Sequence, residues 1–101
     1  MPCIIYIDRG NFTVGEPIYI TLVNMSNTNL HIGSWGILDE NGKAIYSIKP
    51  PQITIGPGSS LVVVWFQLDN EGKQVSKGRY RAYWKPEDGD LECLSEFFDI
   101  S

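Results

Sequence analysis

The side chains that could do chemistry are one histidine, two cysteines and several carboxylates. His31 would have to act as general base for any serine nucleophile, yet no Gly-x-Ser-x-Gly sequence accompanies it. A zinc site needs about four ligands, and the cysteines lie near opposite ends of the chain, far from the spacing of such a site. We therefore expect His31 to be an ordinary strand residue with no metal bound.

Carboxylates gather in three turns, where calcium binding or acid–base catalysis could occur. The groups are Asp39 with Glu40, Asp69 with Glu71, and Glu87 with Asp88, Asp90 and Glu92. None follows the EF-hand pattern of alternating ligands closed by a glutamate. Spacing leaves a glycosidase-like carboxylate pair open, but small domains rarely offer the cleft that such a pair needs. Solvated turns explain these groups best, so we expect no enzyme activity, no cofactor and no metal.

The elements that must position these side chains are strands. Leu61–Leu68 is β-branched and aromatic, and Arg79–Lys85 alternates between apolar and polar residues. The chain has no helical periodicity and no internal repeat, and its 101 residues suffice for one domain, 1–101. Seven strands are predicted: Cys3–Asp8, Pro17–Asn24, Leu30–Leu38, Lys43–Ile48, Leu61–Leu68, Arg79–Lys85 and Leu91–Ile100.

Seven short strands separated by turns predict an all-β, immunoglobulin-like sandwich of the fibronectin type III kind. One sheet would join 3–8, 17–24 and 61–68, and the other would join 43–48, 30–38, 79–85 and 91–100. Asn41-Gly42 suits the hairpin between two of these strands. Tyr80 stands where such sandwiches place a tyrosine corner.

The two cysteines allow two interpretations. Cys3 and Cys93 could be separate buried thiols. Alternatively, the first and last strands both begin at the same end of the predicted sandwich and often lie side by side, which would bring the two residues within bridging distance. A disulfide would imply an oxidising compartment or a hyperthermophilic cytosol.

Charge and hydropathy bear on partners and location. The formal net charge of −4 argues against a nucleic-acid partner, since affinity for nucleic acid comes largely from Lys and Arg. No apolar run is long enough to insert into a membrane. The N-terminal residues Met1–Ile4 lack a basic region, so no signal peptide is visible. The compartment stays unknown: cytoplasmic on that absence, extracellular if a leader has been trimmed.

The predicted sheet of 3–8, 17–24 and 61–68 has apolar residues on both faces. Gln67 at the end of its third strand suggests that Leu61, Val63 and Trp65 point outward. The alternative is the inverted orientation of that strand, or cover from the preceding connection. An exposed apolar patch of this kind usually marks a partner surface. Its predicted members are Tyr6, Tyr19, Val23, Val63 and Trp65.

From residue 39 to residue 80 the chain resembles the bacterial intracellular proteinase inhibitor family, whose members are immunoglobulin-like domains. The matching features are Asp39…Gly42…Tyr46, Gly56-Pro57-Gly58-Ser59, Trp65, Asp69…Gly72 and Gly78-Arg79-Tyr80. The resemblance implies inhibition of serine proteases through an exposed loop. The rigid, proline-rich connection 49–59 is the candidate loop, with Pro50, Pro51, Gln52 and Ile53 at its centre.

Three functions follow as hypotheses. The first is a non-enzymatic domain that pairs with a protein partner or with itself, through the apolar face or an open edge strand. The second is a proteinase inhibitor acting through the loops 25–29, 49–59 and 86–90. The third is a carbohydrate- or small-ligand-binding sandwich that uses an exposed Trp35 or Trp65.

Overall fold

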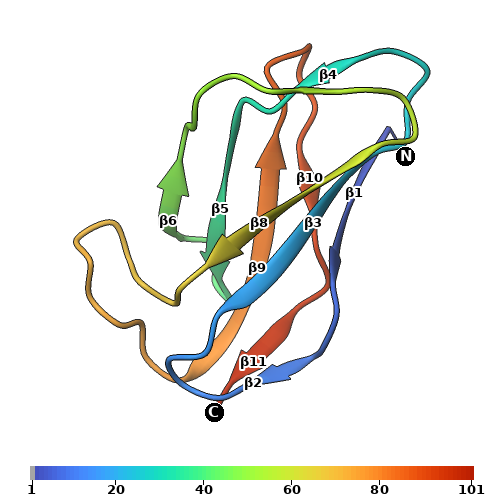
Figure 1. Ribbon diagram of the computed structural model, residues 1–101. Helices are drawn as coiled ribbons and strands as arrows, with labels where there is room; N and C mark the ends of the chain where they lie inside the picture. The colour runs from blue at the N-terminus through green and yellow to red at the C-terminus, as the bar shows by residue number, and fades with distance from the viewer. Residues whose placement is uncertain (1) are drawn as a thin grey trace.

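The alternating sequence folds into two stacked β-sheets and a small two-stranded sheet in the computed structural model, which describes residues 2–101 (Figure 1). Met1, which the predicted domain 1–101 includes, lies outside the described residues. Residues 2–101 contain strands, turns and loops but no helix, so the predicted all-β class is confirmed. Accordingly, no helix in this part of the chain is long and apolar enough to cross a membrane.

The smaller sheet has three antiparallel strands in the order β1-β3-β8. These strands are β1 (Cys3–Ile7), β3 (Ile18–Asn24) and β8 (Ser60–Trp65). They correspond to the first, second and fifth predicted strands, so the predicted partners of this sheet are confirmed. In Figure 1 this sheet lies in front of the other.

The larger sheet has the order β2-β11-β9-β5-β6, with β10 also pairing with β9. The central strands are β9 (Gly78–Lys85) and β5 (Ser34–Asp39), flanked by β6 (Ala44–Ile48) and β11 (Phe98–Ile100). The short strands β2 (Asn11–Phe12) and β10 (Cys93–Leu94) complete it. Strand β2 runs parallel to β11, whereas the other pairs are antiparallel.

The structure divides two predicted strands and adds two that were not predicted. Leu30–Leu38 becomes β4 (Leu30–His31) and β5, because Gly33 has a φ of 61° and turns the chain between them. Leu91–Ile100 becomes β10 and β11. Strand β7 (Thr54–Ile55) pairs with β4 inside a connection that was predicted to be irregular, and β2 was also missed. The expected count of seven strands is thus too low: residues 2–101 contain eleven.

Aromatic rings fill the space between the sheets. Trp65 packs edge-on against Tyr80 and Phe98, and Phe12 meets Phe98 in a T-shaped contact. The Tyr80 hydroxyl donates to the Ser76 carbonyl at 2.6 Å, which fastens this buried ring to the backbone just before β9. Buried aromatic pairs of this geometry stabilise a core beyond their buried area.

A disulfide joins Cys3 of β1 to Cys93 of β10 and so links the two sheets covalently. The two Cα atoms lie 6.1 Å apart, and both side chains are buried. The alternative of two free thiols is therefore wrong. The first and last strands do approach each other, as the predicted layout required.

Candidate functional site

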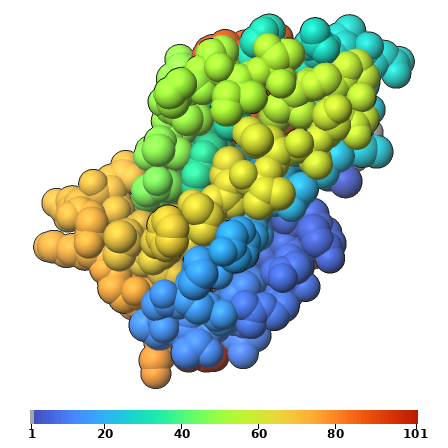
Figure 2. All heavy atoms as spheres, viewed as in Figure 1, coloured from blue at the N-terminus to red at the C-terminus, as the bar shows by residue number. Residues whose placement is uncertain are grey.

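The outer face of β1-β3-β8 is the first candidate site. Strand alternation points Ile4 and Tyr6 of β1 to solvent, and it does the same for Tyr19, Thr21 and Val23 of β3. On β8 the outward residues are Ser60, Val62 and Val64. We call these eight residues the apolar face. Figure 2 shows this side of the molecule, with the three strands running diagonally across it.

Side chains on the apolar face form rows across the sheet. Tyr6 lies opposite Thr21, which lies opposite Val62, and Ile4 lies opposite Val23. Tyr6, Tyr19 and Val62 are each more than half exposed, at 60%, 56% and 57%. None of the eight residues carries a charge. The face is therefore a contiguous, largely apolar surface of the kind that partners bury.

Two of the five residues predicted for this surface lie on the other side of the sheet. Val63 is half-buried and packs against the core, and Trp65 is 1% exposed. The register explains this, because Val63 lies opposite Ile20 and Trp65 lies opposite Ile18, and both isoleucines are fully buried. Tyr6, Tyr19 and Val23 do point outward. The sequence reasoning missed Val62 and Val64, which take the places assigned to Val63 and Trp65.

The predicted orientation of β8 was wrong because it depended on Gln67 being exposed at the end of the strand. The predicted strand 61–68 ends at Trp65, and Gln67 follows with a φ of 62° and a fully buried side chain. Its Nε2 donates to the carbonyls of Thr13 and Glu16, and its Oε1 accepts from the Gly15 amide. A polar side chain with all these partners can be buried at little cost. Gln67 therefore marks a loop anchor instead of an outward-facing strand position.

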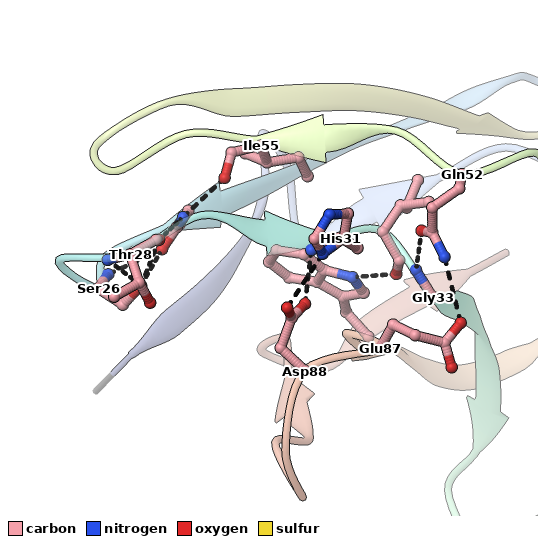
Figure 3. Close-up of polar contacts among 11 residues, drawn as sticks. Ser26, Thr28, His31, Gly33, Gln52, Ile55, Glu87 and Asp88 are labelled. Atoms are coloured by element: carbon pink, nitrogen blue, oxygen red, sulfur yellow. Dashed lines mark hydrogen bonds and ion pairs between the residues drawn. The ribbon is translucent and has the colours of Figure 1, made fainter.

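The second candidate site is the loop end, which we define as residues 25–29, 49–59 and 86–90. The structure brings these predicted loops together (Figure 3). Buried Asn24 donates to the carbonyls of Thr28 and Ile55, which fastens the first loop to the second. Gln52 joins the second loop to the third by donating to Glu87 at 3.2 Å. The three loops named for the inhibitor hypothesis are thus joined to one another by hydrogen bonds.

Asp88 of the third loop binds His31 of β4 beside the loop end. The Asp88 carboxylate accepts from the His31 backbone amide at 2.6 Å, and its other oxygen lies 3.0 Å from His31 Nδ1. These hydrogen bonds, first that from the backbone amide, lower the pKa of Asp88 below its ordinary value. Both side chains are partly exposed, and the pair orients the third loop. Asp88 was predicted only as a solvated turn residue.

Residues Pro50 to Ile53 of the candidate inhibitory loop lie along the outside of the loop end. Pro51 is exposed and Ile53 is 44% exposed, whereas Pro50 is half-buried. The Gln52 side chain is held at both ends, because its Oε1 also accepts from the Gly33 amide at 3.2 Å. The Ile53 carbonyl accepts from the Ile32 amide at 2.9 Å. The segment is therefore an exposed but well-fastened ridge.

Two of the three carboxylate groups belong to turns of the same design. In each turn the aspartate, Asp39 or Asp69, accepts two backbone amides with one carboxylate oxygen, at 2.9–3.0 Å. Each turn then closes at a glycine of positive φ, Gly42 or Gly72. These aspartates hold loop backbone. Within residues 2–101, no three acidic, histidine or cysteine side chains gather closely enough to hold a metal ion.

The ligand-binding hypothesis relied on an exposed tryptophan, and that premise is wrong. Trp35 is 5% exposed and Trp65 is 1% exposed. A surface cleft of about 440 Å³ does lie beside β6 and the 66–77 loop, lined among others by Lys43, Asn70 and Gln74. Its lining offers no exposed ring on which a sugar could stack.

No family model matches the sequence, and no curated protein matches it. Among solved structures, the fold is similar to part of the Pseudomonas fluorescens alkylpurine DNA glycosylase AlkC, whose structure contains DNA with an abasic site analog. The TM-score is 0.55 at 12% sequence identity, over 99% of this chain and 30% of the glycosylase chain. This chain thus spans less than a third of the length of that protein. At this identity the likeness concerns the fold.

The likeness corrects two expectations, that the chain is not an enzyme and that nucleic acid is no partner. Neither exclusion follows from the sequence, because a similar architecture forms part of a DNA glycosylase whose structure contains DNA. The physical reason is that the composition of one domain says little about the longer protein in which such a domain can occur. Net charge also averages over faces that differ, so a value of −4 cannot exclude a local contact with DNA.

Proposed function

We propose that this chain is an immunoglobulin-like β-sandwich that works as an assembly domain, with a second copy bound through the β1-β3-β8 sheet. The fold proposal is supported by two sheets in the predicted strand groups and by β2 running parallel beside β11. The bond from the Tyr80 hydroxyl to the Ser76 carbonyl matches the tyrosine corner of such sandwiches.

The uncharged apolar face carries the functional proposal. Tyrosine is enriched where proteins meet and charged residues are depleted there, and this surface displays two exposed tyrosines and no charge. Burial of the exposed Val62 beside them would contribute favourable free energy to binding. A sheet face exposed to water normally carries charged and polar residues, whereas the apolar face carries no charged residue.

Light scattering on a size-exclusion column tests the proposal across a hundredfold range of protein concentration. We expect a dimer whose population rises with concentration. A monomer at every concentration would overturn self-association. A parallel titration with duplex DNA containing an abasic site analog, read by fluorescence anisotropy, tests whether this domain binds the kind of DNA present in the glycosylase structure. Saturable DNA binding by the monomer alone would replace the assembly proposal with a nucleic-acid one.

The convergence of the three loops supports a second candidate function, a proteinase inhibitor. The loop end presents Pro51 and Ile53 on a ridge fastened by Gln52, and rigid exposed loops lose little entropy on binding a protease. Titration of trypsin, chymotrypsin and subtilisin with the protein tests this. Stoichiometric inhibition of any of them would support the candidate, and undiminished activity of all three at excess protein would reject it.

A further inference from the structure

We propose that the partner strand is β8 itself, which pairs antiparallel with β8 of a second copy so that two three-stranded sheets become one of six. This inference rests on the proposed assembly function and specifies its geometry. Strand β8 lies at the end of the order β1-β3-β8, so only β3 pairs with it. Backbone groups alternate sides along a strand, which leaves half of those on β8 directed away from β3.

Strand β8 lacks the charges, prolines and bulges by which many sheet edges avoid pairing. Natural edges carry charges, prolines or bulges, or lie under a loop. Ser60–Trp65 has the sequence SLVVVW, with no charge, proline or glycine. Its register with β3 is continuous over Ile18–Val23. Three successive valines also favour the extended backbone that an incoming strand needs.

The neighbouring edge of the other sheet, β6, is protected in several of these ways. The side chain of Asn70 accepts from the Ser47 backbone amide at 2.9 Å and so occupies a donor of that strand. A shift of register interrupts the pairing of β6 with β5 between Ile37 and Leu38. Lysines, Lys43 and Lys49, flank the strand at both ends. Of the two neighbouring edge strands, β6 is protected against pairing, and β8 is the one available to pair with another strand.

Core residues beside β8 are incompletely covered. Leu61 and Val63 point toward the core, yet both are only half-buried, as are Ile45 and Tyr46 of β6. Leu61 and Val63 belong to β8, which has no strand beyond it in its sheet. A strand added to β8 would cover Leu61 and Val63 while it satisfies the backbone edge.

Side chains alternate between the two faces of a strand, and this restricts the register in which two copies of β8 can pair. Residues opposite each other in an antiparallel pair point to the same side, so both copies keep their outward residues together only if the two residue numbers sum to an even value. A two-fold axis beside Val62 meets this condition. It places Val62 against Val62 of the second copy and Val64 against Ser60. The two apolar faces then become continuous.

Substitution of Val62 by lysine tests the pairing in the full chain. Val62→Lys places two like charges across the two-fold axis, and we expect the dissociation constant of the dimer to rise at least about tenfold. Tyr6→Lys is the matched control. Tyr6 lies in the same cross-strand row, is exposed to the same degree and faces the same side, but it lies on β1 at the far edge. This control should leave the dimer intact.

Each outcome of light scattering on the three proteins has a distinct meaning. Loss of the dimer in Val62→Lys alone supports β8 pairing. Loss in both variants indicates that the faces stack, which overturns edge pairing and keeps the assembly proposal. Retention in both also overturns it, and a monomeric wild type overturns the assembly proposal itself.

Amide hydrogen exchange of the wild type gives an independent readout that needs no variant to fold. We expect alternate amides of β8 to be protected in the dimer and to lose that protection on dilution. Equal exchange of β8 amides at high and low concentration would contradict the inference. The Asn70-capped Ser47 amide serves as an internal reference, since its protection does not depend on a partner.

Discussion

The two sheets present opposite kinds of surface to solvent. Strand β9 at the centre of the larger sheet turns Arg79, Arg81 and Lys85 outward, and each has a partner on the neighbouring segment. Arg79 pairs with Asp99 at 3.0 Å and Lys85 with Glu92 at 3.4 Å, while Arg81 donates to the Ser95 carbonyl. The apolar face of β1-β3-β8 has no such charges.

This difference bears on which of the two outer faces a partner could cover at lower cost. A charged face whose ion pairs are satisfied internally gains little from a partner, because binding would strip water from groups that already have contacts. An uncharged face has no ion pairs to desolvate, so covering it with a partner does not carry this cost. The overall charge of −4 averages the two and hides the asymmetry.

Removing the covalent link between the sheets should have the largest effect. We expect Cys3→Ala combined with Cys93→Ala to lower the free energy of unfolding by roughly 4–5 kcal/mol, because the bond closes a loop over nearly the whole chain. Denaturation with guanidinium chloride measures the loss. Wild-type protein unfolded under reducing conditions is the control and should match the variant. A loss below about 1 kcal/mol would contradict the prediction.

Trp65, the last residue of β8, and Phe66, which follows the strand, compare a buried with an exposed aromatic side chain at adjacent positions. Trp65→Ala should lower the free energy of unfolding by about 3–5 kcal/mol, since it removes a buried ring and one donor to the Leu68 carbonyl. Phe66 is 58% exposed, so Phe66→Ala should cost about 1 kcal/mol or less. Comparable losses at both positions in thermal or chemical unfolding would refute the observed orientation of β8.

The two outer faces should also differ in what a single truncation costs. Arg81→Ala removes two hydrogen bonds to the Ser95 carbonyl and the cation–π contact with Phe97, so we expect a loss of about 1–2 kcal/mol. Thr21→Ala at the centre of the apolar face should change stability by about 0.5 kcal/mol or less. Chemical unfolding of the monomer at low concentration measures both. If Thr21→Ala lowered the free energy of unfolding as much as Arg81→Ala, the predicted difference between the two outer faces would be wrong.

Much of the fold was predictable because local chemistry and tertiary structure agree. The alternation of 79–85 and of 17–24 predicted both strands and most of their buried residues, although Tyr83 is buried on the face where alternation predicted polar residues. The Asn41-Gly42 turn predicted a hairpin. Topology brought Cys3 and Cys93 within reach of each other, but the sequence left a disulfide and two free thiols as alternatives, and the structure has the disulfide. Short strands such as β2 and β7 were missed, because two residues carry no periodicity and form only when the rest of the fold brings their partners near.

The candidate site was only partly predictable. Strand β8 is apolar on both faces, so alternation could not orient it, and the polar residue used as a guide, Gln67, is buried by hydrogen bonds to distant residues. The orientation of β8 could have been inferred from β3, the strand that pairs with it. The buried residues of β3 are Ile18, Ile20 and Leu22. Their strand was correctly oriented, and pairing it in register with β8 would have placed Val62 outside and Val63 inside.

The Cys3–Cys93 bond also decides how the domain would respond to being pulled. Tension applied at its two ends would pass through the covalent bridge, so residues 3–93 would be shielded from extension. Only the stretch 94–101, which includes β11, could peel away, and this would lengthen the molecule by roughly 30 Å. In an oxidising environment the sandwich would thus act as a nearly inextensible link, and a reductant would turn it into an extensible one.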